Sequence, residues 1–432
     1  MTERRDISIK VPVLARVEGE GALDLEIRDG KIEELKLRIF EPPRLFEKFL
    51  EGRSYDEVAD IVARICGICP VAYQMSAVHA IEQVFECDPG PWVHEMRRLL
   101  YCGEWLESHG LHVHLLALPD FFGFNSVAEM AKQFPDEVKR GLALQAIGNE
   151  IVRFLGGRSV HPIGVRVGGF YKAPAAADAA TLLQKVQQQL AHAESLLRWS
   201  AALDLPSSKQ DFVSVAIRQA DEYPMNEGRI VSDAGHMLVS ENFERHFKEH
   251  QAPHSTALHC HLDGQPYLVG PLARLNLNHD VLPDAVKSLL HECGIVFPSQ
   301  NMFHSIIARS VEIYYGLFEA ARILEDYVVP DVPYVDVIPR AGIGFGCTEA
   351  PRGLLWHRYE LDDAGRIVQA TIVPPTSQNQ ARIEEDLYNE LLAFGLHNDD
   401  AALRLRAEMV IRNYDPCISC STHFLDLRVK RI

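Results

Sequence analysis

Two Cys-x-x-Cys pairs near opposite ends of the chain constrain its fold more than any other feature. Cys66 and Cys69 stand in the stretch RICGICP, and Cys417 and Cys420 in the stretch DPCISCSTHF, of a 432-residue chain. In a zinc ribbon two such pairs are usually about 15–20 residues apart. Four thiols suit one soft metal ion. An ion bound by both pairs here would join the two ends of the chain, and its site could form only once the fold is complete.

Either pair alone is weak evidence, because a Cys-x-x-Cys pair can also be a redox dithiol or half of a zinc site. Nine cysteines in a chain without an export signal do not suggest a disulfide framework. Five of them have no partner nearby in sequence, and we expect these to be small buried apolar residues. They are Cys87, Cys102, Cys260, Cys293 and Cys347.

The chain lacks the sequence features of an exported or membrane protein. Its first residues, MTERRDISIK, have no apolar run behind the basic residues, unlike a secretory signal. No stretch approaches the roughly 20 consecutive apolar residues that a membrane span needs. We therefore expect a cytoplasmic protein with no membrane span. A formal net charge of −17 argues against nucleic acid as a partner.

Apolar periodicity predicts an α+β fold that is mainly helical. Alternating residues predict a hairpin within 7–40, turning at Asp29-Gly30, and a second hairpin over 353–373. Helices that are apolar on most faces usually lie inside a bundle. The predicted helices cover 43–65 with a break at Gly52, 70–86, 92–118, 134–155, 177–203, 282–292, 303–327, 377–395 and 398–411.

These elements predict a single unit with a central bundle of long helices and small peripheral β hairpins. We expect an N-terminal β region over 1–45 and a helical bundle with inserts over 46–340. A hairpin and a C-terminal metal-binding segment would follow over 341–432. At 47% hydrophobic residues, the chain can bury a large core.

Three further stretches accompany the cysteine pairs. They are ARVEGEG (15–21), GRSVHP followed by Gly168-Gly169, and EAPRG (349–353). In their order along the chain, all five stretches resemble motifs of the large subunit of nickel–iron hydrogenases. The matches span residues 15–423, so the resemblance covers nearly the whole chain. It implies the fold of that subunit and, as its activity, the reversible heterolytic splitting of H₂.

The resemblance implies a role for each cysteine. All four would bind nickel, and Cys69 and Cys420 would also bridge to an iron ion whose other ligands are carbon monoxide and cyanide. Cys66 and Cys417 would be bound to nickel alone. A terminal thiolate keeps a lone pair that can take up a proton, so Cys417 would be the first acceptor when H₂ is split.

Four other residues receive roles from the same motifs. Glu18 resembles the glutamate that relays the proton outward. Arg352 would place its guanidinium over the open metal positions, where a fixed cation stabilises developing charge. Pro351 would shape that wall, and Asp415 would orient Arg352. Without the motifs, Glu18 would be interpreted as a surface carboxylate on a strand and Arg352 as a member of a surface salt bridge.

One position departs from the family pattern. Many relatives have an Asp-His pair where this chain has Ser108-His109. The resemblance therefore does not carry over a second carboxylate partner for Arg352. It does imply a magnesium (or ferrous) ion bound by Glu47 and His423, although a solvated helix face is an equally good interpretation of Glu47.

The remaining histidines have simpler interpretations. We expect hydrogen-bonded histidines of the helix bundle at four positions and assign no role to a fifth, His161. The four are His79, His94, His112 and His114.

The resemblance also implies partners. The chain has no cysteine spacing for an iron–sulfur cluster and no nucleotide-binding motif, which implies a separate iron–sulfur small subunit. The stretch GICPVAYQ resembles cytoplasmic bidirectional enzymes, including sulfhydrogenase alpha subunits. Their ferredoxin-like and flavin diaphorase subunits pass electrons to NAD(P), whereas other members reduce sulfur or serve deazaflavin or disulfide reductases.

In many relatives a peptide after the C-terminal histidine is removed once nickel is inserted. The nine residues after His423, FLDLRVKRI, would be such a peptide. If it is removed, we expect the cut just after His423, by a maturation protease acting after nickel-insertion proteins.

Three other functions remain open at this point. A respiratory-complex scaffold subunit shares this ancestry but binds a quinone and has lost the metal, and the four thiols argue against it. A non-catalytic protein could hold a structural zinc ion in the four cysteines. An H₂ sensor would keep the same site and signal to a kinase.

Overall fold

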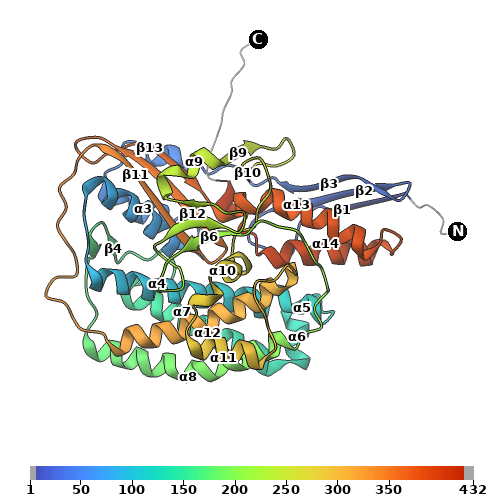
Figure 1. Cartoon of the computed structure of the whole chain (residues 1–432), viewed down its shortest axis with the longest axis horizontal. Coiled ribbons are helices and arrows are strands. Elements are labelled where there is room, and N and C mark those ends of the chain that lie inside the picture. The colour runs from blue at the N-terminus through green and yellow to red at the C-terminus, as the bar shows by residue number, and fades with distance from the viewer. Residues whose placement is uncertain (1–5, 423–432) are drawn as a thin grey trace, which may run out of the picture.

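Long helices form one side of the molecule and small antiparallel sheets the other (Figure 1). The computed structural model describes residues 6–422. In the helical layer, α4 packs against α7 and α12, and α8 packs against α12. The bounds of these helices are Pro91–Leu111 (α4), Pro135–Gly156 (α7), Ala176–Ala201 (α8) and Ser305–Glu325 (α12). The expected fold class, a helical bundle with small peripheral sheets, is confirmed.

Glycines set the close approach between α4 and α7. A Cβ atom on Gly148 would lie 2.6 Å from the carbonyl oxygen of Gly103, so neither helix could keep its position with a larger residue there. The predicted helix over 92–118 differs from the structure in one respect. It changes after Leu111 into a π-helix, η1 (His112–Ala117), and such turns are frequent at functional sites.

The N-terminal sheet has the order β1-β2-β3 and is antiparallel throughout. Its bounds are Ile7–Val11 (β1), Gly21–Arg28 (β2) and Lys31–Ile39 (β3). The predicted turn at Asp29-Gly30 is confirmed, with φ of 51° and 73°, as a two-residue hairpin turn requires. The structure adds β1 to the two predicted strands, and residues 12–20 form a loop between β1 and β2.

A second antiparallel sheet, of order β11-β12-β13, packs on α3. The bounds are Pro70–Phe85 (α3), Gly342–Ala350 (β11), Gly353–Leu361 (β12) and Ile367–Val373 (β13). The hairpin β12–β13 is the predicted one, whereas β11 was not predicted. The glycines of β11 allow it to pack closely on α3. Cβ atoms on Gly344 and Gly346 would each lie 1.9 Å from a carbonyl oxygen of that helix.

Most of the other strands lie in a segment for which the sequence predicted no element. They form a sheet of order β6-β7-β8 and a hairpin, β9–β10. Their bounds are Val215–Arg218 (β6), Arg229–Ser232 (β7), Met237–Leu238 (β8), Phe247–Gln251 (β9) and Leu258–Leu262 (β10). Short strands with little alternation give a weak signal, and here long-range packing decides their structure.

Short helices and one small hairpin complete the fold. The predicted break at Gly52 is confirmed, since α1 and α2 flank it. The bounds are Phe46–Leu50 (α1), Tyr55–Val62 (α2), Leu118–Phe121 (α5), Val127–Gln133 (α6), Val165–Arg166 (β4), Gly169–Phe170 (β5), Phe243–His246 (α9), Pro271–Asn278 (α10) and Asp284–Glu292 (α11).

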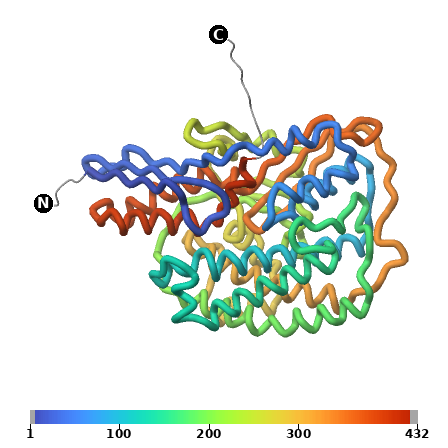
Figure 2. Tube along the Cα trace, turned by 180° about the vertical axis from the view of Figure 1, so that it is seen from behind, coloured from blue at the N-terminus to red at the C-terminus, as the bar shows by residue number. Residues whose placement is uncertain are grey.

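The two ends of the chain lie side by side. In Figure 2 the blue N-terminal strands run along the red C-terminal helices. These helices, α13 (Pro375–Phe394) and α14 (Asp400–Tyr414), contact β3 and β1 respectively. This arrangement brings the C-terminal cysteines back to the N-terminal half. Among the helices of residues 6–422, none is both long and apolar enough to cross a membrane.

Candidate metal centre

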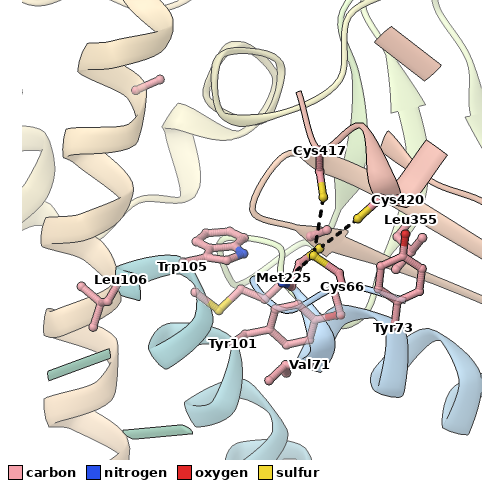
Figure 3. Packing of buried hydrophobic residues seen from close by; sticks show 14 of the residues in the cluster. Cys66, Val71, Tyr73, Tyr101, Trp105, Leu106, Met225, Leu355, Cys417 and Cys420 are labelled. Atoms are coloured by element: carbon pink, nitrogen blue, oxygen red, sulfur yellow. Dashed lines mark hydrogen bonds between the residues drawn. The ribbon is translucent and has the colours of Figure 1, made fainter. Parts of the chain in front are cut away.

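The four cysteines of the two pairs meet in one buried cluster. The Sγ atoms of Cys66 and Cys417 are 3.5 Å apart, those of Cys69 and Cys420 are 3.8 Å apart, and all four lie within 4.8 Å of one another. Figure 3 shows the sulfur atoms of Cys417 and Cys420, on the C-terminal segment, pointing toward that of Cys66. Metal–sulfur bonds of about 2.3 Å in a tetrahedral site put the sulfurs about 3.8 Å apart. The spacing and the soft donor set therefore fit a shared metal centre.

Local backbone geometry places the first pair. Cys69 directly precedes α3, and Pro70 opens that helix. The sulfur of Cys66 accepts the backbone N–H groups of Ile68 and Cys69, at 3.3 and 3.2 Å. Backbone donors of this kind stabilise a thiolate, and they hold its sulfur in one position.

A buried glutamate on α4 supports the start of α3. The carboxylate of Glu104 accepts the backbone N–H groups of Val71 and Ala72, at 2.6 and 3.2 Å. It thereby satisfies two of the N–H groups that a helix leaves unpaired at its N-terminus. The sequence analysis did not identify Glu104, because its partners lie on another helix and no local motif marks it.

The second pair follows the end of α14. Asp415 has a left-handed backbone, with φ of 55°, and turns the chain into the cluster. The backbone N–H of Cys417 donates to the hydroxyl of Thr376, at the start of α13, over 3.0 Å. The N–H of Ile418 donates to the carbonyl of Glu18, also over 3.0 Å. Both neighbours come from segments distant in sequence.

Glu18 lies beside the sulfur of Cys417. Its Oε2 is 3.1 Å from that sulfur and 3.1 Å from the backbone N–H donor of Ser419. Glu18 belongs to the loop between β1 and β2, not to a strand. A neighbouring glycine allows this contact, since a Cβ on Gly19 would lie 2.7 Å from the Cβ of Ile418. The interpretation of Glu18 as a surface carboxylate on a strand is therefore wrong.

Arg352 and Pro351 form the two-residue turn between β11 and β12. The Nε of Arg352 donates to the carbonyl of Asp415 over 2.6 Å, and one terminal nitrogen donates to its carboxylate over 3.0 Å. The other terminal nitrogen, Nη1, is buried and has no hydrogen-bond partner within residues 6–422. Burial disfavours the cation, but Asp415 and the cluster thiols raise the pKa of Arg352. Arg352 is thus a fixed cation at the cluster, not a member of a surface salt bridge.

The residues at the Ser108-His109 position do not contact Arg352 through hydrogen bonds or ion pairs in the described part of the chain. The hydroxyl of Ser108 is buried without a hydrogen-bond partner, and His109 is hydrogen-bonded to Glu312 over 2.8 Å. Asp415 is the carboxylate that forms an ion pair with Arg352. The preceding residue, Glu107, is nearly buried, and burial followed by the charge of Cys66 raises its pKa to about 8. The sequence analysis missed Glu107.

The thiols affect one another's ionisation. Burial opposes ionisation of Cys66, but hydrogen bonds from the other three cysteines and the charge of Arg352 lower its pKa. Burial and the neighbouring thiols raise the pKa of Cys417. A metal ion bound by this cluster would displace the remaining protons, because cysteine binds metals as the thiolate.

Glu47 lies on α1 and is partly buried. Its Oε1 accepts the backbone N–H of Ile372 over 2.7 Å, and burial raises its pKa to about 7. The interpretation as a solvated helix face is therefore wrong. The carbonyl of Thr422, the last described residue, accepts the N–H of Arg44 over 2.6 Å, which brings the C-terminal segment to α1. The other predicted magnesium ligand, His423, lies outside the described residues.

The predicted bundle histidines are mostly hydrogen-bonded. His112, His114 and His94 contact the carbonyl of Arg412, the carbonyl of Gly110 and the carboxylate of Glu227, at 2.7, 3.1 and 3.1 Å. His161 contacts the carbonyl of Ala63 at 2.6 Å. Within residues 6–422 one ring nitrogen each of His79, His112 and His114 is buried without a hydrogen-bond partner, and for His79 the partnerless atom is Nε2.

Three of the five remaining cysteines are buried, as predicted. The other two, Cys87 and Cys293, are partly exposed.

Comparisons with known proteins agree with this site. A model of the nickel-dependent hydrogenase family matches residues 44–140 and 241–423. The alpha subunit of sulfhydrogenase 1 from Pyrococcus furiosus is 33% identical over 98% of this chain and 99% of its own. The beta subunit of the NAD-reducing hydrogenase HoxS from Cupriavidus necator is 27% identical over 95% of this chain and 94% of its own.

Solved structures share the fold. An NAD⁺-reducing NiFe hydrogenase in the H₂-reduced state aligns with a TM-score of 0.87 at 26% identity, over 96% of this chain and 99% of that one. The NiFeSe hydrogenase of Dm. baculatum aligns with a TM-score of 0.80 at 24% identity, over 97% and 100%. Together with the buried four-cysteine cluster, these matches establish that the chain belongs to the nickel-dependent hydrogenase family, as a catalytic large subunit.

Proposed function

We propose that this chain oxidises H₂ reversibly at a nickel–iron centre held by Cys66, Cys69, Cys417 and Cys420, with carbon monoxide and cyanide as further iron ligands. The observation that carries the proposal is the arrangement of four buried thiols with a carboxylate and a fixed guanidinium beside them. A structural zinc ion would need only the thiols. When bound, the metal centre supplies the redox-active Lewis acid that polarises and splits H₂.

The proton leaves through side chains of the chain itself. Cys417 holds the proton at its sulfur and passes it to Oε2 of Glu18, 3.1 Å away. General acid–base groups must be within about 2.6–3.2 Å of the proton's partner, and this contact meets that limit.

Ser419 holds the carboxylates of Glu18 and Glu41 on either side of it. Its backbone N–H donates to Glu18, and its hydroxyl donates to Oε2 of Glu41 over 3.0 Å. Glu18 is itself partly exposed, so it can release the proton to water.

Arg352 supplies fixed positive charge beside the cysteines that would hold the centre. Its free Nη1 gives it a donor for the reacting groups, while Asp415 holds the other nitrogens in place. A preorganised cation stabilises charge that develops in the transition state without reorganising. Pro351 fixes the backbone of the same turn, and we propose that it lines the metal centre next to Arg352.

A second ion, magnesium (or ferrous iron), is proposed at Glu47 and His423. Glu47 supports it, because its carboxylate is partly buried and a hard cation prefers such oxygen ligands. Glu249 adds to the negative charge there. Burial and the charge of Glu47 raise its pKa to about 8. An ion bound between these carboxylates would offset their repulsion.

The electrons released from H₂ require an acceptor outside this chain. Within residues 6–422 the four cysteines of the centre form the one group of thiols placed for metal binding. We therefore propose an iron–sulfur small subunit as the first electron acceptor. The NAD-reducing relatives support NAD(P), reached through flavin diaphorase and ferredoxin-like subunits, as the final acceptor. The sulfhydrogenase relative supports sulfur reduction as a side activity.

We propose that the enzyme works in the cytoplasm. We propose that nickel-insertion proteins load the site and that a maturation protease then cleaves after His423. Intact-mass analysis of active protein tests the cleavage, and a full-length active chain would rule out its necessity.

The experiment is a purification that retains the partners. We expect nickel and iron together, infrared bands of carbon monoxide and cyanide, and H₂-dependent reduction of NAD, NADP or sulfur, assayed separately. Zinc without nickel, and no such bands, would refute the nickel–iron centre. The metals with negligible turnover would instead indicate an H₂ sensor.

A further inference from the structure

We propose a second, structural metal site beside α13, formed by His254, His259 and Glu384. Its ligand would be a divalent transition-metal cation with the preferences of Zn²⁺. The three residues come from the turn of the β9–β10 hairpin, from β10 and from α13. This site involves no residue of the nickel–iron centre, and the inference does not rest on the proposed function.

The distances suit a small cation. Nε2 of His254 is 2.8 Å from Oε1 of Glu384, and Nε2 of His259 is 3.4 Å from Oε2 of the same carboxylate. One ligand atom from each of the three residues lies within 4.8 Å of the other two. Tetrahedral zinc with bonds of about 2.0–2.1 Å separates its ligand atoms by about 3.3 Å. Small adjustments of these side chains would therefore complete three corners of a zinc site.

His259 provides an independent sign that something is bound here. Its side chain is only 4% exposed, yet neither ring nitrogen makes a hydrogen bond of acceptable geometry within residues 6–422. Buried polar groups are nearly always satisfied. The Nε2 faces the Glu384 carboxylate without the alignment of a hydrogen bond, and a cation between the two would satisfy both.

Two further imidazoles adjoin the site on the same face of the hairpin. His250 pairs with His259 across the strands, and His261 stacks on His250 with ring centroids 4.6 Å apart. The His250 ring also lies against His259, with ring centroids 5.6 Å apart.

A metal here would tie together elements that position the catalytic centre. Oε1 of Glu384 also accepts the backbone N–H of Leu37 on β3, over 2.9 Å. The hairpin turn contacts β3 as well, since the N–H of Thr256 donates to the carbonyl of Ile39 over 2.8 Å. At the start of α13, Thr376 accepts the N–H of Cys417. The ion would thus cross-link the β9–β10 hairpin to α13, whose first turn is hydrogen-bonded to Cys417.

A second triad at the open end of the same hairpin serves as the control. It consists of His236, His246 and Asp263, whose atoms also lie within 4.8 Å. Its imidazoles have hydrogen-bond partners without a metal. Asp263 contacts His236 at 2.9 Å and His246 at 3.1 Å, and the hydroxyl of Ser232 is hydrogen-bonded to the other ring nitrogen of His236. Half of the Asp263 side chain is also exposed. We infer that this triad is a hydrogen-bonded cluster.

The test measures zinc in the purified multisubunit enzyme. The enzyme is treated with a chelator, incubated with Zn²⁺ alone, desalted and analysed by mass spectrometry for zinc, nickel and iron. We expect one equivalent of zinc in the wild type. We expect the zinc content to fall at least tenfold in His259→Gln and in Glu384→Gln, and to stay unchanged in the control His236→Gln. Zinc should also raise Tm in the wild type and the control but not in the other two variants.

Two checks distinguish the loss of zinc from this site from misfolding of the variant and from zinc bound in the cysteine cluster. Nickel content in each variant reports whether the fold has formed, because the cysteine centre needs both chain ends. X-ray absorption at the zinc edge should show nitrogen and oxygen ligands, whereas sulfur ligands would place the zinc in the cysteine cluster. Equal zinc content in wild type and His259→Gln, or no zinc retained by any of them, would overturn the proposal.

Discussion

The thiol of Cys417 donates to the carboxylate of Glu18 over 3.1 Å, although 399 positions separate the two residues. Their backbones meet as well, since the N–H of Ile418 donates to the carbonyl of Glu18. The loop before β2 and the turn after α14 therefore form one unit. A proton acceptor on one segment and its donor on the other can be aligned only in the folded chain.

Glu18→Gln should stop proton transfer while leaving the metal centre assembled. Glutamine keeps the size of the side chain and can still accept from Ser419, but it cannot carry the proton. We expect H₂ oxidation to fall by about 10²- to 10⁴-fold, the usual contribution of a general base, with nickel and iron content unchanged. Glu20→Gln, at an exposed neighbouring position, is the matched control. Turnover above a tenth of wild type in Glu18→Gln would contradict the relay.

Cys417→Ser should remove nickel. A hydroxyl replaces the soft thiolate, and the site loses one of four ligands in a cluster whose spacing fits a single centre. We expect nickel below a tenth of the wild-type content by mass spectrometry, with H₂ oxidation lost. Cys87→Ser changes a partly exposed cysteine outside the cluster and should retain both. Full nickel content in Cys417→Ser would show that this cysteine is not a ligand.

Gly19→Ala should disturb the contact between the two segments. Gly19 has φ of 87°, and a Cβ there would lie 2.7 Å from the Cβ of Ile418 and 3.0 Å from the backbone nitrogen of Ser419. Gly30→Ala is the control, since Gly30 has a similar φ of 73° but open space around it. Both variants introduce the same backbone strain, but only Gly19→Ala also introduces a steric clash. We therefore expect H₂ oxidation to fall by at least tenfold in Gly19→Ala and to stay unchanged in Gly30→Ala. Equal activities would show that the contact does not matter.

Arg352→Met should destabilise the fold as well as abolish turnover. Arg352 and Asp415 are both nearly buried, and removing one partner of a buried ion pair costs about 3–5 kcal/mol. Arg352→Met combined with Asp415→Asn removes both charges, and we expect it to recover part of that stability in urea unfolding but none of the activity. Recovered turnover in the double variant would show that the guanidinium has no role in the reaction.

The sequence predicted the centre better than its surroundings. Cys66 and Cys417 were assigned from motifs, because the chemistry of a metal site restricts residue types locally. Glu104 has no such motif, since its partners are the backbone N–H groups of another helix. The same is true of His259 and Glu384, which lie far apart in the sequence and meet only after β10 packs against α13.

In the fold, too, features decided by local sequence were predicted and features decided by tertiary contacts were not. The turn at Asp29-Gly30 was predicted because both residues favour a positive φ. The strand β11 was not predicted, because its glycines reduce strand propensity and their reason, contact with the backbone of α3, is a tertiary one. Glu47 could not be distinguished from a surface glutamate, since its burial depends on β13.

An ion pair between α4 and a distant loop should make stability depend on pH. His94 is 3.1 Å from Glu227 and 3.8 Å from Glu222, and these carboxylates raise its pKa to about 10. The hydrogen bond from His94 in turn lowers the pKa of Glu227 to about 2. Because the folded state holds the His94 proton more tightly, this stabilisation is complete below about pH 6.5 and is lost as the pH rises toward 10.

His94→Gln should therefore be less stable than wild type at pH 5.5, and the difference should shrink steadily up to pH 9.5. Urea unfolding of the purified enzyme at pH 5.5, 7.5 and 9.5 measures this directly. His192→Gln changes a histidine on α8 that is hydrogen-bonded to the nearby Gln189, and it should follow the wild-type curve. A constant difference between His94→Gln and wild type across this range would mean that packing, and not the charge of His94, carries its contribution.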